Sequence, residues 1–246
     1  MDELFVVESA KDKDRILKIA QNGAVSVFAK SAPGLPLDYG PGYPAKIDFD
    51  ANGNLYTAVV GWYDNPFNPF GDVLDTLYKI TPDGVVQKIA RQFLSPNIFL
   101  DIAGLTFGPD GYLYMGETWT PRDILKVNLV NNTSVQFAAG IQSLDILFDK
   151  QGNLLVIGAT SWYMVGNKIW MYTPSGVGSL YSDAFQYPYA ITWGPDGNLY
   201  VVDLGAKAVY IMDPVTKAVT PFATGFTNPY DIEFDSKGNL YVVEGQ

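Results

Sequence analysis

A short phrase recurs five times along the chain and constrains its fold more than any other feature. Each copy is an apolar strand, a turn that closes on glycine and a second apolar strand, as in residues 47–56 and 232–241. The turn glycines recur at intervals of 41 to 58 residues, at Gly53, Gly111, Gly152, Gly197 and Gly238. Alternating apolar strands repeated at this spacing predict the blades of a β-propeller.

Two further strands complete each unit. The third strands are predicted at 16–19, 77–80, 124–127, 169–172 and 209–212, and the fourth at 25–28, 85–89, 135–137, 178–181 and 219–222. The second strand occurs six times, because residues 3–8 match residues 239–244. We therefore predict an all-β fold, a single propeller domain over residues 1–246 built from four-stranded antiparallel blades. The strand count favours five blades, and the alternative is six blades with incomplete terminal ones.

Composition excludes several classes of function. The net charge of −10 disfavours nucleic acid as a partner. The chain has no Cys and no His, which rules out disulfides, zinc sites with Cys or His ligands, and Ser–His or Cys–His catalysis. No apolar run is long enough to span a membrane. We expect no catalytic residue, no cofactor and no metal.

The phrase Phe-Asp-x-x-Gly-Asn-Leu-Tyr-Val-Val in residues 234–243 resembles the NHL-repeat superfamily of propellers. That superfamily includes regucalcin/gluconolactonase-like enzymes, virginiamycin B lyase-like enzymes and ScyD/ScyE-like secreted proteins. The family resemblance favours six blades. It also implies a catalytic His for the lyases, which this chain lacks.

For the gluconolactonase-like enzymes the resemblance implies a divalent metal on the propeller axis. Its ligands would stand four residues before the end of each first strand, where this chain has Ala45, Ala103, Leu144, Tyr189 and Tyr230. Hard cations prefer carboxylate or amide oxygens, so this set predicts no metal. The next positions hold Lys46, Gly104, Asp145, Ala190 and Asp231, where the lysine opposes a cation.

Two sets of carboxylates admit a functional and a structural interpretation. The Asp that opens each glycine turn could bind calcium, but the turn lacks the rest of a calcium loop, so a hairpin turn is favoured. A second set ends the second strands, at Glu8, Glu117, Asp203 and Glu244. Its recurrence in several blades favours carboxylates that accept backbone N–H bonds over catalytic groups.

Aromatic residues gather in the loops expected at one end of the blades. Loops after the second strands carry Trp62, Tyr63, Trp119 and Trp162, and segments before the first strands carry Tyr39, Tyr43, Tyr187, Tyr189 and Tyr230. These rings either plug the axis or bind a protein or glycan. We predict Trp62, Tyr63, Trp119, Trp162, Tyr189 and Tyr230 as partner-binding residues.

The function predicted from these features is a secreted or surface propeller that binds or assembles without catalysis. In a closed five-bladed ring only one of the two matching terminal strands has a place. Leu240, Tyr241, Val242 and Val243 would then pair with another copy of the chain. Asn131 and Asn132 open overlapping N-glycosylation sequons, in line with an extracellular or cell-surface location. No secretory signal opens the sequence, so we expect a mature or trimmed form. The alternatives are a metal-dependent hydrolase or lyase and a carbohydrate- or peptide-binding module.

Overall fold

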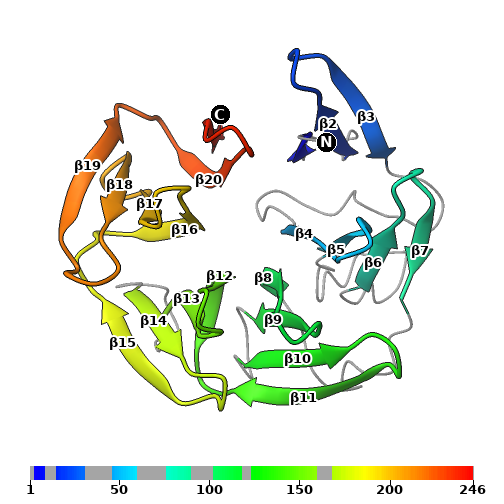
Figure 1. The fold of residues 1–246 in the computed structure, drawn as a ribbon, viewed down its shortest axis with the longest axis horizontal. Coiled ribbons are helices and arrows are strands. Elements are labelled where there is room, and N and C mark those ends of the chain that lie inside the picture. Colours follow the sequence, from blue (N-terminus) through cyan, green and yellow to red (C-terminus); the bar gives the residue numbers. More distant parts are fainter. Residues whose placement is uncertain are drawn as a thin grey trace, which may run out of the picture. The chain divides into compact units, whose positions relative to one another are not determined.

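A computed structural model describes residues 3–8, 15–30, 46–59, 76–89, 102–117, 123–159 and 168–245. All helix and strand structure in these ranges is β-strand, and the strands form antiparallel sheets (Figure 1). In the described ranges no helix has the length and apolar character needed to cross a membrane. The chain divides into two compact units, Met1–Ala139 and Gly140–Gln246.

Unit 1 contains three sheets, each with its strands in sequence order. The first comprises β1 (Leu4–Glu8), β2 (Arg15–Ile19) and β3 (Val25–Lys30). The second comprises β4 (Ile47–Phe49), β5 (Leu55–Val59), β6 (Thr76–Ile80) and β7 (Val86–Lys88). The third comprises β8 (Ile102–Phe107), β9 (Leu113–Glu117), β10 (Ile124–Asn128) and β11 (Thr133–Ala138). The first strands β4 and β8 contact each other, as neighbouring propeller blades do.

Unit 2 continues the pattern with two complete blades and a hairpin. The blades are β12 (Gln142–Phe148), β13 (Leu154–Ala159), β14 (Lys168–Tyr172) and β15 (Gly178–Ser182), then β16 (Pro188–Trp193), β17 (Leu199–Asp203), β18 (Ala208–Met212) and β19 (Val219–Thr224). The hairpin is β20 (Pro229–Phe234) and β21 (Leu240–Glu244). Strand β16 contacts both β12 and β20, so the three first strands lie side by side.

These sheets confirm the predicted all-β propeller of four-stranded antiparallel blades. First strands are β4, β8, β12, β16 and β20, and the six second strands include both β1 and β21. Five innermost strands match a five-bladed propeller, the number that the strand count favours. Each matching terminal segment has its own partner, since β1 pairs with β2 and β21 with β20. The single-domain prediction stays a prediction.

Each glycine turn is built by a carboxylate and a positive φ. The Asp50 carboxylate accepts N–H bonds from Asn52 (2.9 Å) and Asn54 (2.9 Å), and Asn54 Nδ2 donates to its other oxygen (2.7 Å). Gly53 closes the turn at φ +76°, a backbone region that suits glycine. The carboxylate oxygens are thus occupied by donors of the turn itself, which confirms the hairpin interpretation.

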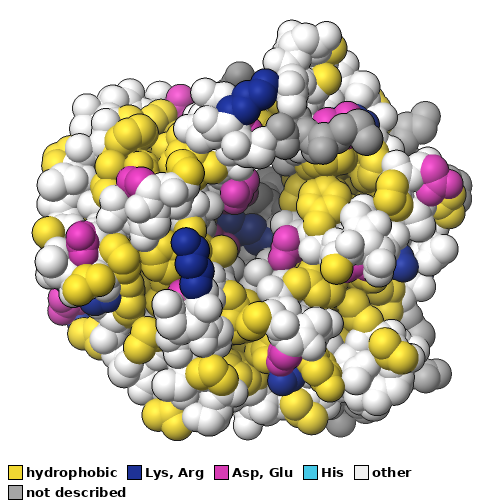
Figure 2. All heavy atoms as spheres, in the orientation of Figure 1, with side chains coloured by type: hydrophobic (Ala, Val, Ile, Leu, Met, Phe, Trp, Pro, Cys, Tyr) yellow, Lys and Arg dark blue, Asp and Glu magenta, His cyan; other side chains and the backbone are white. Residues whose placement is uncertain are grey.

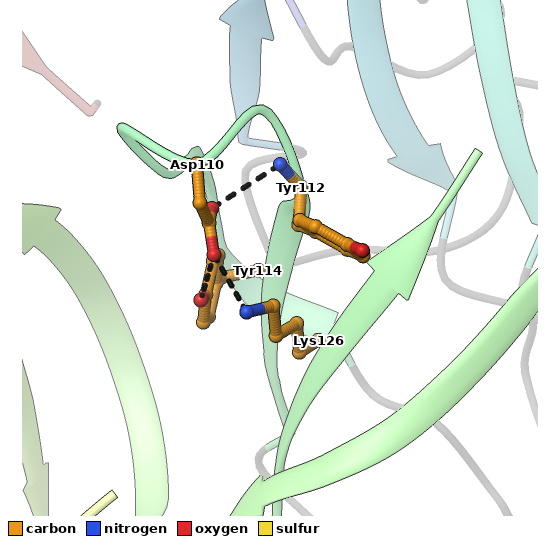
Figure 3. A network of polar contacts seen from close by, with 4 residues as sticks. All are labelled: Asp110, Tyr112, Tyr114 and Lys126. Carbon is orange, nitrogen blue, oxygen red and sulfur yellow. Dashed lines mark hydrogen bonds and ion pairs between the residues drawn. The ribbon is translucent and has the colours of Figure 1, made fainter. Parts of the chain in front are cut away.

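In β8–β9 the turn carboxylate is joined by a lysine from the third strand (Figure 3). Asp110 accepts hydrogen bonds from the Tyr112 N–H (3.3 Å) and the Tyr114 hydroxyl (2.9 Å), and its Oδ2 lies 2.6 Å from Lys126 Nζ. The ammonium also lies 4.4 Å from the centre of the Tyr112 ring, within cation–π range. Partial burial would raise the pKa of Asp110, but these partners lower it below its usual value. The network therefore links the turn to β10 through the ion pair of Asp110 with Lys126.

Candidate functional site

A β-bulge recurs at one position of the first strands. The pairing register of β8, β12, β16 and β20 with their second strands shifts at this position, which leaves one extra residue in each strand: Ala103, Leu144, Tyr189 and Tyr230. Bulges re-aim side chains and are common beside binding and active sites. They coincide with the positions that the family resemblance marks as metal ligands. In unit 2 two of the three bulge residues are tyrosines.

Three tyrosines of unit 2 form one cluster. Rings of Tyr189 and Tyr230 meet edge to face, with centroids 5.3 Å apart. The Tyr187 and Tyr189 rings lie 6.4 Å apart at a tilt of 33°. All three side chains are half-buried, so each keeps some surface for contact. We call Tyr187, Tyr189 and Tyr230 the tyrosine cluster.

The carboxylate at the end of β17 holds the segment that carries Tyr187. Asp203 is only 1% exposed, and its oxygens accept N–H bonds from Gln186 (2.7 Å), Tyr187 (2.9 Å) and Ala206 (3.0 Å). The Leu204 N–H donates to the Tyr187 carbonyl (2.9 Å). A buried carboxylate with three backbone donors fixes the loop firmly. This confirms the structural interpretation of Asp203.

Glu244 holds the segment before β20 in a similar way. Its Oε1 accepts the Thr227 N–H (2.6 Å), and the Gly245 N–H donates to the Asn228 carbonyl (3.0 Å). A Cβ on Gly245 would overlap the ring of Tyr230, so the glycine lets the backbone lie against that ring. In unit 1, Glu117 accepts the Asp123 N–H (3.0 Å) and Glu8 pairs with Arg15. Asp203, Glu117 and Glu244 thus accept backbone N–H bonds as predicted, whereas Glu8 forms an ion pair with the Arg15 side chain of β2.

Carboxylates also link neighbouring first strands. Asp145 on β12 accepts the Ile191 N–H of β16 (2.9 Å), and Thr192 Oγ1 of β16 donates to Glu233 on β20 (3.2 Å). In unit 1, Asp48 on β4 accepts the Phe107 N–H of β8 (2.7 Å). These contacts join strands whose residues lie far apart in the sequence.

Burial sets the pKa of two of these linking carboxylates. Burial raises the pKa of Asp48 above its usual value, and its hydrogen bonds offset only part of that rise. Glu233 keeps exposed surface, but the surrounding strands remove much of its water. This desolvation raises its pKa, and the nearby charges of Asp231 and Asp145 add to the effect.

The described residues do not fit an axial divalent metal of the gluconolactonase type. At the bulges, Ala103 and Leu144 offer no ligand and Tyr189 and Tyr230 offer phenols, whereas hard cations prefer carboxylate and carbonyl oxygens. Both Asp145 oxygens already accept backbone N–H bonds, from Ile146 (3.0 Å) and Ile191 (2.9 Å). Within the described ranges, no three acidic side chains converge as a metal site would require.

The structure brings together part of the predicted binding set. Tyr189 and Tyr230 touch, whereas Trp62, Tyr63, Trp119 and Trp162 lie outside the described residues, as do Tyr39, Tyr43 and Ala45. Asn131 and Asn132 are exposed in the turn between β10 and β11. Leu240, Tyr241, Val242 and Val243 form most of β21. Tyr187 was missing from the predicted set, although its place before a first strand was a signal for it.

Charged side chains are scattered among hydrophobic ones on the face drawn in Figure 2, and Lys and Arg do not gather into one patch there. The described residues drawn on this face form no basic stripe of the kind that contacts phosphates in nucleic-acid-binding proteins. This agrees with the net charge of −10.

The sequence matches no protein-family model and no curated protein. Solved structures do resemble the chain. A catalytically inactive histidine-to-alanine variant of virginiamycin B lyase from Staphylococcus aureus, with quinupristin, is 17% identical at a TM-score of 0.62, over 99% of this chain and 78% of that one. One chain of a nidogen–laminin complex is 15% identical at a TM-score of 0.72, over 99% and 85%. A candidate gluconolactonase is 15% identical at a TM-score of 0.58, over 84% and 77%.

Identities this low establish the fold and not the activity. The similar structures include a lyase and a component of a protein–protein complex, so the same fold serves quite different functions. The predicted resemblance to virginiamycin B lyase-like and gluconolactonase-like propellers is confirmed at the level of fold. The chain has the β-propeller fold that these proteins share.

Proposed function

We propose that this chain is a non-catalytic binding propeller that holds a macromolecular partner on the tyrosine cluster. The observation that carries the proposal is the anchored cluster itself. Tyr187 and Tyr230 lie in segments whose backbones are fixed by Asp203 and Glu244, and Tyr189 packs between them. Rigid, half-buried tyrosines contribute large contact area at a low cost in conformational entropy, which is why they are common in binding surfaces.

The lyase-like alternative has less support from this chain. In the related lyase, replacing a histidine by alanine gives a catalytically inactive protein, and these 246 residues contain no His. The hydrolase alternative needs a metal, which the bulge residues do not fit. A calcium- or magnesium-dependent rise in melting temperature that Asp231→Ala abolishes would favour that alternative.

The binding proposal is tested by selecting ligands from a displayed random-peptide library and a glycan array. We expect a ligand whose binding is lost in the Tyr189→Leu/Tyr230→Leu variant and kept in Tyr189→Phe/Tyr230→Phe. The phenylalanine variant preserves the rings and so controls for loss of packing. Ligands that bind the leucine variant equally well would contradict the proposal.

Self-association through β21 is a second candidate, favoured by the exposure of Tyr241 (40%) and Val243 (37%) on that strand. A second copy that covered this face would bury both side chains. We expect light scattering on the 246-residue chain to show oligomers that dissociate in a Tyr241→Arg/Val243→Arg variant. A monomer at every concentration, or oligomers unaffected by the variant, would exclude this candidate.

The proposed location is outside the cell or at its surface. The exposed sequon residues Asn131 and Asn132 support it, because oligosaccharyltransferase needs an accessible turn. Surface proteolysis of intact cells of the source organism tests this location: the chain should be cleaved without permeabilisation. Protection until the cells are opened would contradict it.

A further inference from the structure

The charges around the tyrosine cluster restrict the kind of partner it can bind, and this inference rests on the proposed function. Asp231 directly follows Tyr230 at the bulge of β20, where the strict alternation of side chains is broken. Glu233 lies two residues further along the same strand, where its carboxylate accepts hydrogen bonds from Thr192 Oγ1 (3.2 Å) and the Phe234 N–H (3.1 Å). Strand β20, which carries Tyr230, therefore also carries negative charge, whereas β16, which carries Tyr189, has no charged residue.

Tyrosine rings in this arrangement suit a cation. The edge-to-face contact of Tyr189 with Tyr230 turns the planes of the two rings 65° apart. Ring faces are negative, so a guanidinium or ammonium group gains cation–π attraction over them. The same chain shows this contact at Lys126, whose Nζ lies 4.4 Å from the Tyr112 ring centre beside the Asp110 carboxylate.

We propose that the tyrosine cluster docks a basic segment of a protein partner, with an arginine or lysine side chain against Tyr189 and Tyr230 and its charge balanced by Asp231 and Glu233. Charge complementarity selects this occupant. An acidic segment would be repelled by the carboxylates of β20, and a neutral glycan could donate hydrogen bonds to them but would gain no attraction between opposite charges. The turn after β17 contains Leu204, whose N–H donates to the Tyr187 carbonyl, and it also contains Lys207. The ammonium group of Lys207 would repel a basic partner that came close to it.

The experiment titrates the chain with a blocked tetrapeptide of alternating lysine and arginine, by calorimetry at low and at physiological salt. Its controls are the matching glutamate–aspartate tetrapeptide and cellopentaose. We expect the basic peptide alone to bind, and its affinity to fall as salt rises. Tyr230→Leu should weaken binding at least about fivefold, and Tyr230→Phe should retain it because the ring face remains.

Matched variants separate a specific site from attraction to the net charge. Asp231→Asn and Asp213→Asn remove the same charge, but Asp213 lies in the β18–β19 turn at the opposite end of its blade. We expect Asp231→Asn to weaken binding of the basic peptide at least about threefold, and Asp213→Asn to have little effect. Circular dichroism and melting temperature confirm that each variant is folded.

The outcomes distinguish this inference from the proposed function. Equal losses in Asp231→Asn and Asp213→Asn, or no loss in Tyr230→Leu, would overturn the inference. Binding of the acidic peptide or cellopentaose in a tyrosine-dependent manner would overturn it too, while leaving the binding function intact. If the basic peptide fails to bind, the inference is wrong, and the library selection decides the proposed function separately.

Discussion

Strands β17 and β21 have nearly the same sequence, Leu-Tyr-Val-Val followed by Asp or Glu, but very different surroundings. All five residues of β17 are buried, whereas those of β21 are half-buried or exposed. Tyr200 is 6% exposed and its counterpart Tyr241 40%; Val202 is 0% exposed and Val243 37%. The comparison shows that neighbouring strands and blades determine burial here, since local sequence is almost constant.

Side-chain alternation explains which residues of β21 are more exposed than their counterparts in β17. Leu240 and Val242 pack against the core cluster around Tyr200 and Val202, as a second strand does toward the preceding blade. Tyr241 and Val243 point to the other face of the strand. In β17 that face packs against Ile232 of the following hairpin, but for β21 no such partner occurs among the described residues of unit 2. Within unit 2, strand β21 thus packs through the Leu240–Val242 face alone.

The largest difference in stability should come from placing a charge at Val202 of β17 and, separately, at its counterpart Val243 of β21. We expect Val202→Asp to lower the free energy of unfolding by at least about 3 kcal/mol, because it buries an unpaired carboxylate. In the monomeric chain Val243→Asp should change it by less than about 0.5 kcal/mol, since its site is solvent-exposed there. Urea unfolding, with hydrogen exchange of each strand as a local readout, measures both.

A large cost for Val243→Asp would break the comparison. It would mean that the Tyr241–Val243 face is covered in solution. Repeating the measurement at several protein concentrations identifies the cover, because burial by a second copy makes stability depend on concentration. A cost independent of concentration points to a cover within the chain.

A smaller difference in stability cost is expected when the loop-binding carboxylates Asp203 and Glu244 are each removed. Asp203→Ala removes a buried acceptor of three N–H groups and should cost about 3 kcal/mol. Glu244→Ala removes an exposed acceptor of the Thr227 N–H and should cost at most about 1 kcal/mol. Thermal unfolding gives the ranking, and exchange of the Tyr187 and Thr227 amides reports the loosened loops. Equal costs would show that both loops are held equally tightly.

Features encoded in a few neighbouring residues were predictable from the sequence. The strands, the glycine turns and the loop-binding role of Asp203 and Glu244 each depend on a local pattern, and the structure confirms them. Tyr189 and Tyr230 could be assigned to one end of the blades because antiparallel connections place equivalent positions together.

Features that depend on pairing between distant segments were not predictable. The bulges at Tyr189 and Tyr230 appear only when the register of two strands is known. The bond from Ile191 to Asp145 joins residues 46 positions apart. The contrast between Val202 and Val243 has no local signal at all, because the two tetrapeptides that contain them are identical. Tertiary contacts therefore determine the bulges at Tyr189 and Tyr230 and the burial of equivalent side chains.

The smallest difference in stability is expected between the turn carboxylates of the β16–β17 and β20–β21 hairpins, because their hydrogen bonds are formed within the turn itself. Asp196 and Asp235 each supply the carboxylate of a glycine turn, Asp235 as the first residue of its turn and Asp196 as the third, after Gly194. In Asp196 slight desolvation opposes the hydrogen bonds from Asn198 and Tyr200, and in Asp235 the Asn239 side chain is the main partner; both carboxyls have a lowered pKa. A lowered folded pKa stabilises the fold above the unfolded value of about 4, and the gain is lost as pH falls through the folded pKa. We expect Asp196→Asn and Asp235→Asn each to flatten the decline of stability below about pH 4, and by similar amounts. Urea unfolding at stepwise lower pH measures the slopes. A much steeper dependence on Asp196 than on Asp235 would show that the third strand strengthens the turn, and that even this local device depends on its blade.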